Sequence, residues 1–293
     1  MIAGPTRLAN RARRALSRGP KTAASAELLI GTALAATLLL LAALGDSLTA
    51  QDPSLSNLRS RLLPVGHAQH ILGTDQIGRD ILARLLAGLS WSLSAALAST
   101  AIALSLGVAL GLMAAAGGRA RKVIGWVIDT IIALPGLVIA ICIIAVVGQG
   151  WLPMVLTLGL LGWPVFARVV MAEALSLMER TYVVNARLQG VATPLILLRH
   201  VLPGMTATLL VMTAFQAADM LIAESALSFL GIGAPLGAPT WGNMLAEARQ
   251  YLIRAPWLVF APGLAIIITV LTANLLGDGL GQYFRGRGPA PLL

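Results

Sequence analysis

The chain has 293 residues, of which 57% are hydrophobic and only 11% are charged. Soluble domains carry about 25% charged residues, so this composition excludes a soluble globular protein and predicts an integral membrane protein. The net charge of +9 is compatible with nucleic-acid binding, but the basic residues cluster beside apolar segments. That placement indicates orientation in a membrane, and no nucleic-acid partner is expected.

Six apolar segments predict membrane spans. A helix needs about 20 apolar residues to cross the hydrocarbon, and a lone span must be helical because only a helix satisfies its own backbone hydrogen bonds there. The predicted spans are Leu28–Leu44, Leu93–Ala116, Val123–Val147, Trp151–Met171, Met205–Ile222 and Trp257–Leu276. Pro135 and Pro164 are expected to kink the third and fourth spans. The predicted fold class is therefore all-α integral membrane, a six-transmembrane-helix bundle.

Basic residues divide unevenly between the two sides that alternating spans create. The side of the N-terminal tail holds fifteen of the 21 Lys and Arg residues, and the other side holds six. The fifteen are Arg7, Arg11, Arg13, Arg14, Arg18, Lys21, Arg119, Arg121, Lys122, Arg168, Arg180, Arg187, Arg199, Arg285 and Arg287. The six are Arg59, Arg61, Arg79, Arg84, Arg249 and Arg254. Because cytosolic loops are enriched in Lys and Arg, both termini are predicted to be cytosolic.

These spans divide the chain into five parts. A basic cytosolic tail (1–25) precedes the first transmembrane helix (26–44), an external loop (45–92), a core transmembrane domain (93–284) and a cytosolic C-terminal tail (285–293). The basic start could also be a cleaved secretory signal, but Gly45-Asp46-Ser47 lacks a small-x-small cleavage site, which favours a retained helix. The external loop ends in an amphipathic stretch, Arg79–Leu93, expected to lie along the membrane surface or brace the bundle.

The cytosolic loop 173–203 is the most informative part of the core domain. It reads EALSLMERTYVVNARLQGVATPLILLRHVLP, a charged interlude between two apolar spans. Gly190 can end a helix in the left-handed conformation, and Pro203 is compatible with the first turn of the fifth span. The loop is therefore predicted to form two short helical pieces that make a docking surface for another protein.

Motifs for catalysis or nucleotide binding do not occur in the sequence. There is no GxxxxGK[ST] loop, no HExxH, no GxSxG and no Cys/His metal cluster. Any energy source must therefore lie in a partner or in an ion gradient. The lone Cys142 excludes an intramolecular disulfide and is expected to be a small buried apolar residue.

Five segments, taken in order, resemble the permease subunits of bacterial peptide/nickel-type ABC importers, specifically the smaller permease of dipeptide and oligopeptide systems. They are His70–Asp80 (HILGTDQIGRD), Trp163–Arg168 (WPVFAR), Glu224–Gly233 (ESALSFLGIG), Pro239–Leu245 (PTWGNML) and Asn274–Leu280 (NLLGDGL). The resemblance covers about 70 to 287 and implies a type I ABC importer permease in the bacterial cytoplasmic membrane, multi-pass and without catalytic activity of its own.

The same resemblance aligns Tyr182–Pro203 with the family's EAA loop, whose coupling helix fits a groove of the ATPase subunit. The residues implied to couple are Tyr182, Val183, Val184, Asn185, Ala186, Arg187, Gly190, Arg199, His200 and Pro203. Val184 stands where the family has Glu, and Asn185 where it has Ala. The shape of the docking surface is expected to depend on Gly190 and the two short helices more than on an acid.

The resemblance also implies the partners and cofactors. The partners are a second homologous permease forming a heterodimer, two cytosolic ATPase subunits, an extracytoplasmic substrate-binding protein and membrane lipid. No cofactor is expected on this chain, and ATP and Mg are expected on the ATPase subunits. The alternatives are a secondary transporter driven by an ion gradient, a non-transporting scaffold, or nickel, opines or glutathione in place of peptides as substrate.

Ionisable residues within spans are functional hypotheses by default, since they are costly in hydrocarbon. Asp129 is expected to pair with Lys122 or Arg121. Asp219 and Glu224 lie five residues apart on partly different faces; each could line the translocation path and meet a cationic group such as a peptide amine or Ni²⁺, or make interhelical hydrogen bonds. No metal site is expected, because no cluster of three ligands occurs. Separately, a GxxxG motif at 107–111 predicts close helix packing.

Overall fold

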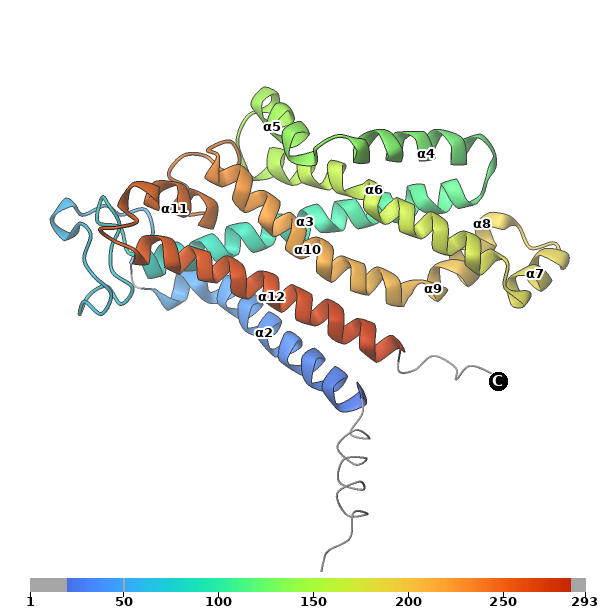
Figure 1. The fold of residues 1–293 in the computed structure, drawn as a ribbon, viewed down its shortest axis with the longest axis horizontal. Helices are drawn as coiled ribbons and strands as arrows, with labels where there is room; N and C mark the ends of the chain where they lie inside the picture. Colours follow the sequence, from blue (N-terminus) through green and yellow to red (C-terminus); the bar gives the residue numbers. More distant parts are fainter. Residues whose placement is uncertain (1–19, 50, 286–293) are drawn as a thin grey trace, which may run out of the picture.

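The computed structural model describes residues 20–49 and 51–285, and its regular elements in that part are all helices (Figure 1). The long ones are α2 (Pro20–Leu48), α3 (Ile81–Ala115), α6 (Trp151–Met178), α10 (Thr206–Phe229) and α12 (Trp257–Arg285). These five are long and apolar enough to cross a membrane, and α4 (Gly118–Ala133) with α5 (Gly136–Val147) makes a sixth if the bent pair is one span. The all-α membrane fold is confirmed. Most of the predicted tails lies outside the described residues.

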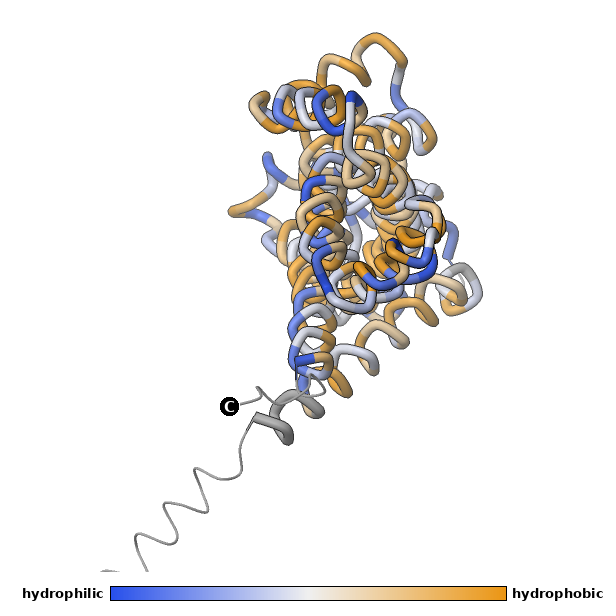
Figure 2. The backbone as a smooth tube through the Cα atoms, turned by 90° about the vertical axis from the view of Figure 1, so that its right-hand side faces the viewer, coloured by the Kyte–Doolittle hydropathy of each residue, from blue (hydrophilic) through white to orange (hydrophobic). Residues whose placement is uncertain are grey.

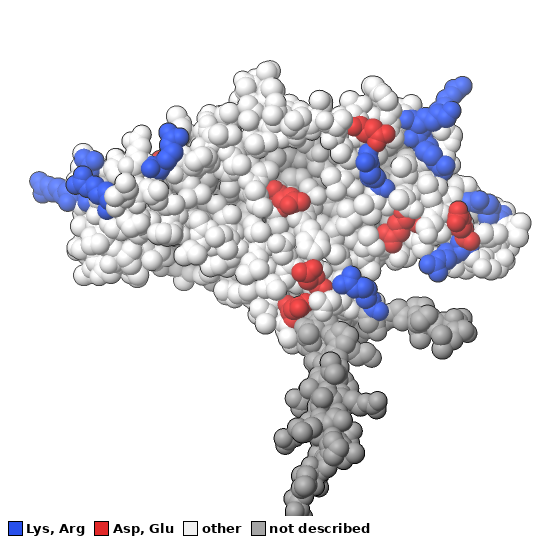
Figure 3. Space-filling view, in the orientation of Figure 1, with Lys and Arg blue, Asp and Glu red and all other residues white. Residues whose placement is uncertain are grey.

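The shorter helices lie at the two ends of this bundle (Figure 1). They are η1 (Leu58–Ser60), α7 (Thr181–Leu188), α8 (Thr193–Ile196), the π-helix η2 (Leu197–Val201), α9 (Leu202–Gly204), α11 (Trp241–Ala248) and η3 (Arg249–Tyr251). We call the end with α7, α8 and α9 the α7 end, and the end with α11 and the loop 51–80 the α11 end. Lys and Arg side chains gather at both ends (Figure 3), whereas hydrophobic residues dominate the helices between them (Figure 2). This division is what a bilayer requires.

The closest helix packing joins α3 to α6. A Cβ atom added to Gly107 would lie 2.3 Å from Cβ of Phe166, and one added to Gly111 would lie 2.8 Å from Cβ of Val170. Only glycine lets the two backbones approach so closely, so the GxxxG prediction is confirmed, with α6 as the partner helix. α2 packs against α12 in a similar way, because a Cβ on Gly279 would lie 2.7 Å from Cα of Leu28.

The predicted third span, Val123–Val147, is wrong as a single helix. The chain breaks between α4 and α5, whose axes differ by 92°. Proline disfavours the helical conformation in the residue before it, and Leu134 is accordingly extended, with φ −97° and ψ 144°. Pro135 therefore causes a break and not a kink. In contrast, α6 continues through Pro164.

The stretch 79–93 is not a separate surface helix. α3 begins at Ile81, where the side chain of Asp80 accepts a hydrogen bond from the backbone N–H of Ala83, and it continues without interruption to Ala115. The amphipathic pattern arises because this first part of α3 buries Ile81 and Leu89 in the main core. The pattern thus identified one face correctly but not the length of the helix.

Two single-residue expectations are also wrong. Asp129 pairs with Arg168 of α6, while Arg121 donates to the backbone carbonyls of Ala114 and Ala115. The aspartate lies nearly two turns beyond Lys122 and faces α6, so its nearest cation comes from another helix. Cys142 is exposed and not buried, since α5 leaves most of its apolar surface uncovered in the isolated chain.

We predict that Gly107→Ala destabilises the chain by about 1–3 kcal/mol, because the added methyl group overpacks the contact with Phe166. Gly125→Ala on α4 is the matched control, since a Cβ there meets nothing within 4 Å and should raise helix stability by about 0.5–1 kcal/mol. Thermal unfolding of both purified variants measures the difference. Equal melting temperatures would show that the α3–α6 contact relaxes freely.

Candidate functional site

α7 is anchored on one side and exposed on the other. Val183 is completely buried and packs with Ile196, Leu197 and Val201 in a cluster at the α7 end. The opposite side presents apolar residues to the surroundings, because the side chain of Leu188 is 81% exposed. An eight-residue helix is too short to be stable alone in water, so this anchor holds it in place and leaves its outer face free for a partner.

A Schellman motif ends α7. Gly190 has φ +84°, its N–H donates to the carbonyl of Arg187 at 3.0 Å, and the N–H of Val191 donates to the carbonyl of Ala186 at 3.2 Å. This pair of bonds requires a left-handed residue, for which glycine has no steric penalty. The predicted role of Gly190 as helix terminator is confirmed.

The chain returns to the bundle through α8, η2 and α9. η2 contains Arg199 and His200 and has π-helical hydrogen bonding, a form that is rare and often found at functional sites. Pro203 lies in α9, a single turn that ends at Gly204 and is followed by Met205 before α10 begins. The predicted second helical piece is therefore an irregular helix, and Pro203 precedes the fifth long helix instead of starting it.

The structure brings all ten predicted coupling residues together at the α7 end. Seven are exposed: Tyr182, Val184, Asn185, Arg187, Gly190, Arg199 and Pro203. Two are half-buried, Ala186 and His200, and one is buried, Val183. The exposed set includes both apolar and basic side chains, and α7, which carries most of it, projects from the end of the bundle (Figure 1).

The two acids predicted in the fifth span lie in different surroundings. Asp219 is exposed on α10, and it has no ion pair in the part of the chain that the structure describes. Glu224 is completely buried. It accepts hydrogen bonds from the hydroxyls of Ser225 and Ser228, at 3.2 and 3.0 Å, with Ser92 of α3 beside it. Glu224 is thus held by hydroxyls of its own helix, and of these two acids only Asp219 is exposed.

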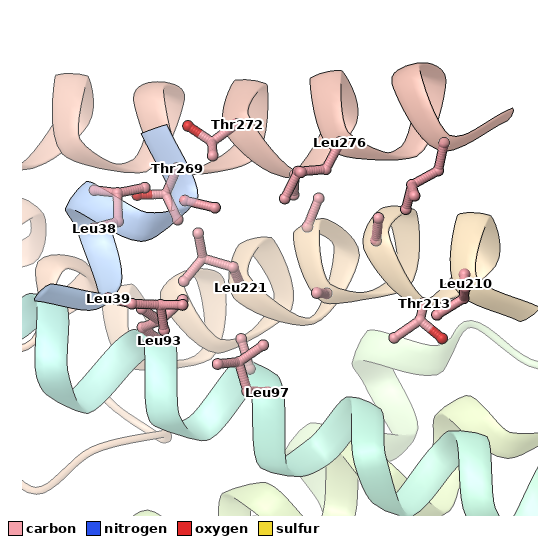
Figure 4. A pocket seen from close by; sticks show the side chains of 17 residues that line it. Leu38, Leu39, Leu93, Leu97, Leu210, Thr213, Leu221, Thr269, Thr272 and Leu276 are labelled. Carbon is pink, nitrogen blue, oxygen red and sulfur yellow. The ribbon is translucent and has the colours of Figure 1, made fainter. Parts of the chain in front are cut away.

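An apolar cavity of about 270 Å³ lies between α2, α3, α10 and α12 (Figure 4). Leucine, alanine and threonine side chains line it, and the hydroxyls of Thr213, Thr269 and Thr272 donate to carbonyls of their own helices. The hydroxyl protons of these threonines are therefore used within their own helices. On a helical wheel, Asp219 lies about half a turn from the cavity residues Leu210, Thr213 and Ala217 of α10, so the cavity and Asp219 belong to opposite faces of this helix.

A second polar centre lies at the α11 end, where four charged side chains meet. Nη1 of Arg84 lies 2.8 Å from Oδ2 of Asp75 and 2.8 Å from Oε2 of Glu247. Arg79 contacts the same two acids, each at 2.5 Å. Arg84 is 2% exposed, and a buried charge is stable only when it is paired and hydrogen-bonded. This network attaches the loop before α3 to α11.

The motif His70–Asp80 is the loop that holds this network. Nδ1 of His70 lies 2.8 Å from Oδ2 of Asp80, the residue that caps α3. Gly78 has φ +82°, and a Cβ there would lie 1.8 Å from the carbonyl oxygen of Asn57. The sequence showed Arg79 and Arg84 only as external basic residues. Their partner Glu247 is 163 residues from Arg84, and no local pattern links the two.

Burial alone would raise the pKa of Glu247, but the hydrogen bonds and charge of Arg84, together with Arg79, outweigh it and hold that pKa below its ordinary value. The carboxylate is therefore ionised at neutral pH. No group of three or more His, Cys, Asp or Glu side chains that could hold a metal ion occurs among the described residues. This centre is consequently an ionic clamp within the fold.

Residues 107–287 match the family model described as "binding-protein-dependent transport system inner membrane component". The chain is 39% identical over 216 residues to a di/tripeptide transport system permease protein of Pseudomonas aeruginosa, covering 73% of this chain and 71% of the relative. It is 40% identical over 212 residues to a glutathione transport system permease protein of Pectobacterium atrosepticum, covering 72% and 70%. A dipeptide transport system permease protein of Alkalihalophilus pseudofirmus is 33% identical over 253 residues, covering 86% and 83%.

We predict that Glu247→Gln destabilises the chain at pH 7 by about 2 kcal/mol, because charge-assisted hydrogen bonds to Arg84 and Arg79 are lost. The lowered pKa of Glu247 means that its contribution is complete above the ordinary glutamate pKa of about 4.3 and is lost as the pH falls through the lower folded value.

The difference in melting temperature between the wild type and Glu247→Gln should therefore shrink between pH 7 and pH 3.5. Asp52→Asn is the control, because Asp52 is exposed and bonds only the N–H of Ser54. A difference that stays constant with pH would contradict the role of the Glu247 charge.

Proposed function

Since the chain belongs to the family of binding-protein-dependent transport system inner membrane components, we propose that it forms half of the translocation pathway of an ATP-driven importer. The family membership that the five short segments indicated is thereby confirmed. The chain is a multi-pass transport permease subunit of the cytoplasmic membrane and not a catalytic subunit. The finer points below, namely its ATPase contact, orientation, partners and substrate, are our proposals.

The single observation that carries the ATPase contact is the geometry of α7. A short helix, anchored through Val183 and ended by Gly190, presents an exposed apolar face beyond the bundle. Such a rigid projection can transmit a displacement from a partner to α6 and α10, between which it lies in the sequence. We propose that this face fits a groove of a cytosolic ATPase subunit, which binds ATP and Mg.

Val184 stands where the family has Glu. This is compatible with an ATPase contact that depends on the shape of an apolar face and not on an acid. Val184 is 40% exposed, so it adds apolar area to the face that Leu188 already forms. Arg187 and Arg199 are also exposed on this surface and would complement an acidic rim. The proposed ATPase groove is therefore apolar at its centre and acidic at its edge.

The α7 end is proposed to be cytosolic, with both termini on that side. The start of α4, the segment 179–205 and the end of α12 all lie at the α7 end (Figure 1), and they hold seven of the nine basic residues of the predicted cytosolic side that the structure describes. The α11 end would then face the extracytoplasmic binding protein. A second homologous permease is proposed to complete the pathway as a heterodimer, surrounded by membrane lipid.

The path is proposed to follow the face of α10 that carries Asp219. That face is open, whereas the opposite one borders the apolar cavity. Glu224 stays a candidate only if the bundle opens around its serine neighbours, since it is completely buried here. The relatives named for di/tripeptides and glutathione favour a small peptide as substrate. Nickel is disfavoured because a metal needs several ligands, and the described residues offer no such group.

ATP binding and hydrolysis would drive the exchange between two bundle states, as long as the ATPase pair binds them with different affinity. Closing the ATPases would draw the two α7 helices together and turn the bundle outward. The binding protein would then release its ligand to the path. Hydrolysis would restore the inward-facing state.

We predict that Leu188→Asp uncouples the complex, because it places a charge in the centre of an apolar contact. Binding-protein-stimulated ATP hydrolysis should fall at least about tenfold, as a loss of 1.4 kcal/mol or more of contact energy implies. Because Leu188 is exposed, the melting temperature should not change.

Leu188→Met is the conservative control and should retain stimulation. The measurement is ATPase activity of the reconstituted complex, together with co-purification of the ATPase subunit. Full stimulation in Leu188→Asp would contradict α7 as the contact. Transport that needs an ion gradient and no ATP would instead support a secondary transporter.

A further inference from the structure

One face of α10 carries Asp219 and borders a second acid, Glu173 of α6. Thr208 and Asp219 are eleven residues apart, which is three helical turns and places them on the same side. Oγ1 of Thr208 donates to Oε1 of Glu173 on α6 at 3.0 Å, so Glu173 borders the same face about 16 Å from Asp219 along the axis. Acidic side chains over α6 and α10 are visible on this side of the molecule in Figure 3.

Neither acid has a counter-charge among the residues that the structure describes. The part of the chain that the structure describes contains no ion pair of Glu173 or Asp219, and the nearby Arg168 is already paired with Asp129. An ionisable group within a span normally faces a protein interior or a water-filled cavity and pairs there with an opposite charge. The two acids are therefore open to a cation from outside the described part of the chain.

The surroundings of Asp219 suit a small solute with one charged end. Phe215 and Ile222 lie one turn before and one turn after it, and both are exposed. The ring of Phe215 rests against α12, where a Cβ on Gly277 would lie 2.9 Å from it. A single carboxylate beside apolar side chains can bind an ammonium group by a charge-assisted hydrogen bond and leave the apolar part of the solute against Phe215. It lacks the several ligands that a metal ion requires.

We propose that Asp219 and Glu173 are two successive binding positions for the ammonium group of the transported solute, such as the free amino terminus of a small peptide. This inference rests on the proposed function, because it assumes that the α10 face lines the path. A tripeptide extends over about 10 Å, less than the separation of the two acids, and it has one ammonium group. That group cannot contact both carboxylates at once, so it leaves Asp219 before it reaches Glu173 and the two contacts are sequential.

The test compares the rates at which positively and negatively charged thiol reagents modify a cysteine on the proposed path. The complete importer complex, carrying Cys142→Ala and Phe215→Cys in this chain, is reconstituted and treated with a cationic trimethylammonium or an anionic sulfonate methanethiosulfonate. Mass spectrometry of this chain gives each rate. In a water-filled path, a carboxylate about 6 Å away favours the cationic reagent about tenfold, and Asp219→Asn should bring the ratio close to that of the free reagents.

Matched variants locate the effect. Asp278→Asn removes an exposed acid of α12 and should leave the ratio unchanged. Thr213→Cys, in the apolar cavity on the opposite face, should react slowly and without charge preference. In a second cysteine chain, Met212→Cys, the thiol lies one turn from Thr208. There Glu173→Gln should abolish the preference for the cationic reagent, as Asp219→Asn does in the Phe215→Cys chain. Loss at position 215 alone would overturn the two-position scheme.

The ammonium group itself is tested by protection. Trialanine should slow the cationic reagent at Phe215→Cys at least about threefold, and N-acetyl-trialanine should not. Asp219→Glu should retain this protection, whereas Asp219→Asn should abolish it. Equal protection by both peptides would overturn the inference, because N-acetyl-trialanine has no positively charged amino terminus.

The remaining outcomes separate this inference from the proposed function. If neither reagent reaches Phe215→Cys in any nucleotide state, the α10 face is not the path and the proposed pathway fails. If both reagents reach it equally fast with Asp219 present, the path stands and the charge recognition fails. If Asp219→Asn prevents co-purification of the second permease, Asp219 belongs to an ion pair between subunits, and the inference is wrong.

Discussion

The energetic penalty of an unpaired charge in hydrocarbon determines how this molecule is organised. Charged side chains gather at the two ends of the bundle, where water is available. The few charged groups at membrane depth must be paired, buried with hydroxyl partners, or open to a path. Asp129 is paired with Arg168, and Glu224 is buried with serine hydroxyls as partners. Asp219 has neither arrangement and is assigned to the path. The same constraint thus separates packing residues from candidate transport residues.

Much of the fold could be predicted because the bilayer imposes simple patterns. The positions of most spans, their helical conformation and the packing of Gly107 follow from apolar runs and small residues. The Schellman motif at Gly190 was also local, since it involves only the six residues from the third-last helical position to Val191. These features depend on neighbours in sequence, and single-sequence reasoning reaches them.

Long-range pairings escaped prediction for the opposite reason. Glu247 neutralises Arg84 from the far end of the chain, and nothing near either residue indicates the other. Glu173 was assigned to the cytosolic loop because it follows an apolar run, but α6 extends to Met178 and carries it against Thr208. The break at Pro135 was underestimated because a proline in a span is compatible with either a kink or an elbow, and only packing decides between them.

The two ends of the bundle are mechanically connected through α3. This helix begins in the ionic clamp at the α11 end, and its 35 residues extend about 52 Å to the turn before α4. Along its middle, Gly107 and Gly111 bring its backbone against α6, the helix that leads directly into α7. A displacement of α7 would therefore be transmitted to α6. Because the α3–α6 contact leaves no space between the two backbones, it would also be transmitted to α3 and the ionic clamp. The proposed function requires such a rigid connection, because it places ATP hydrolysis at one end of the bundle and release of the solute from its binding protein at the other.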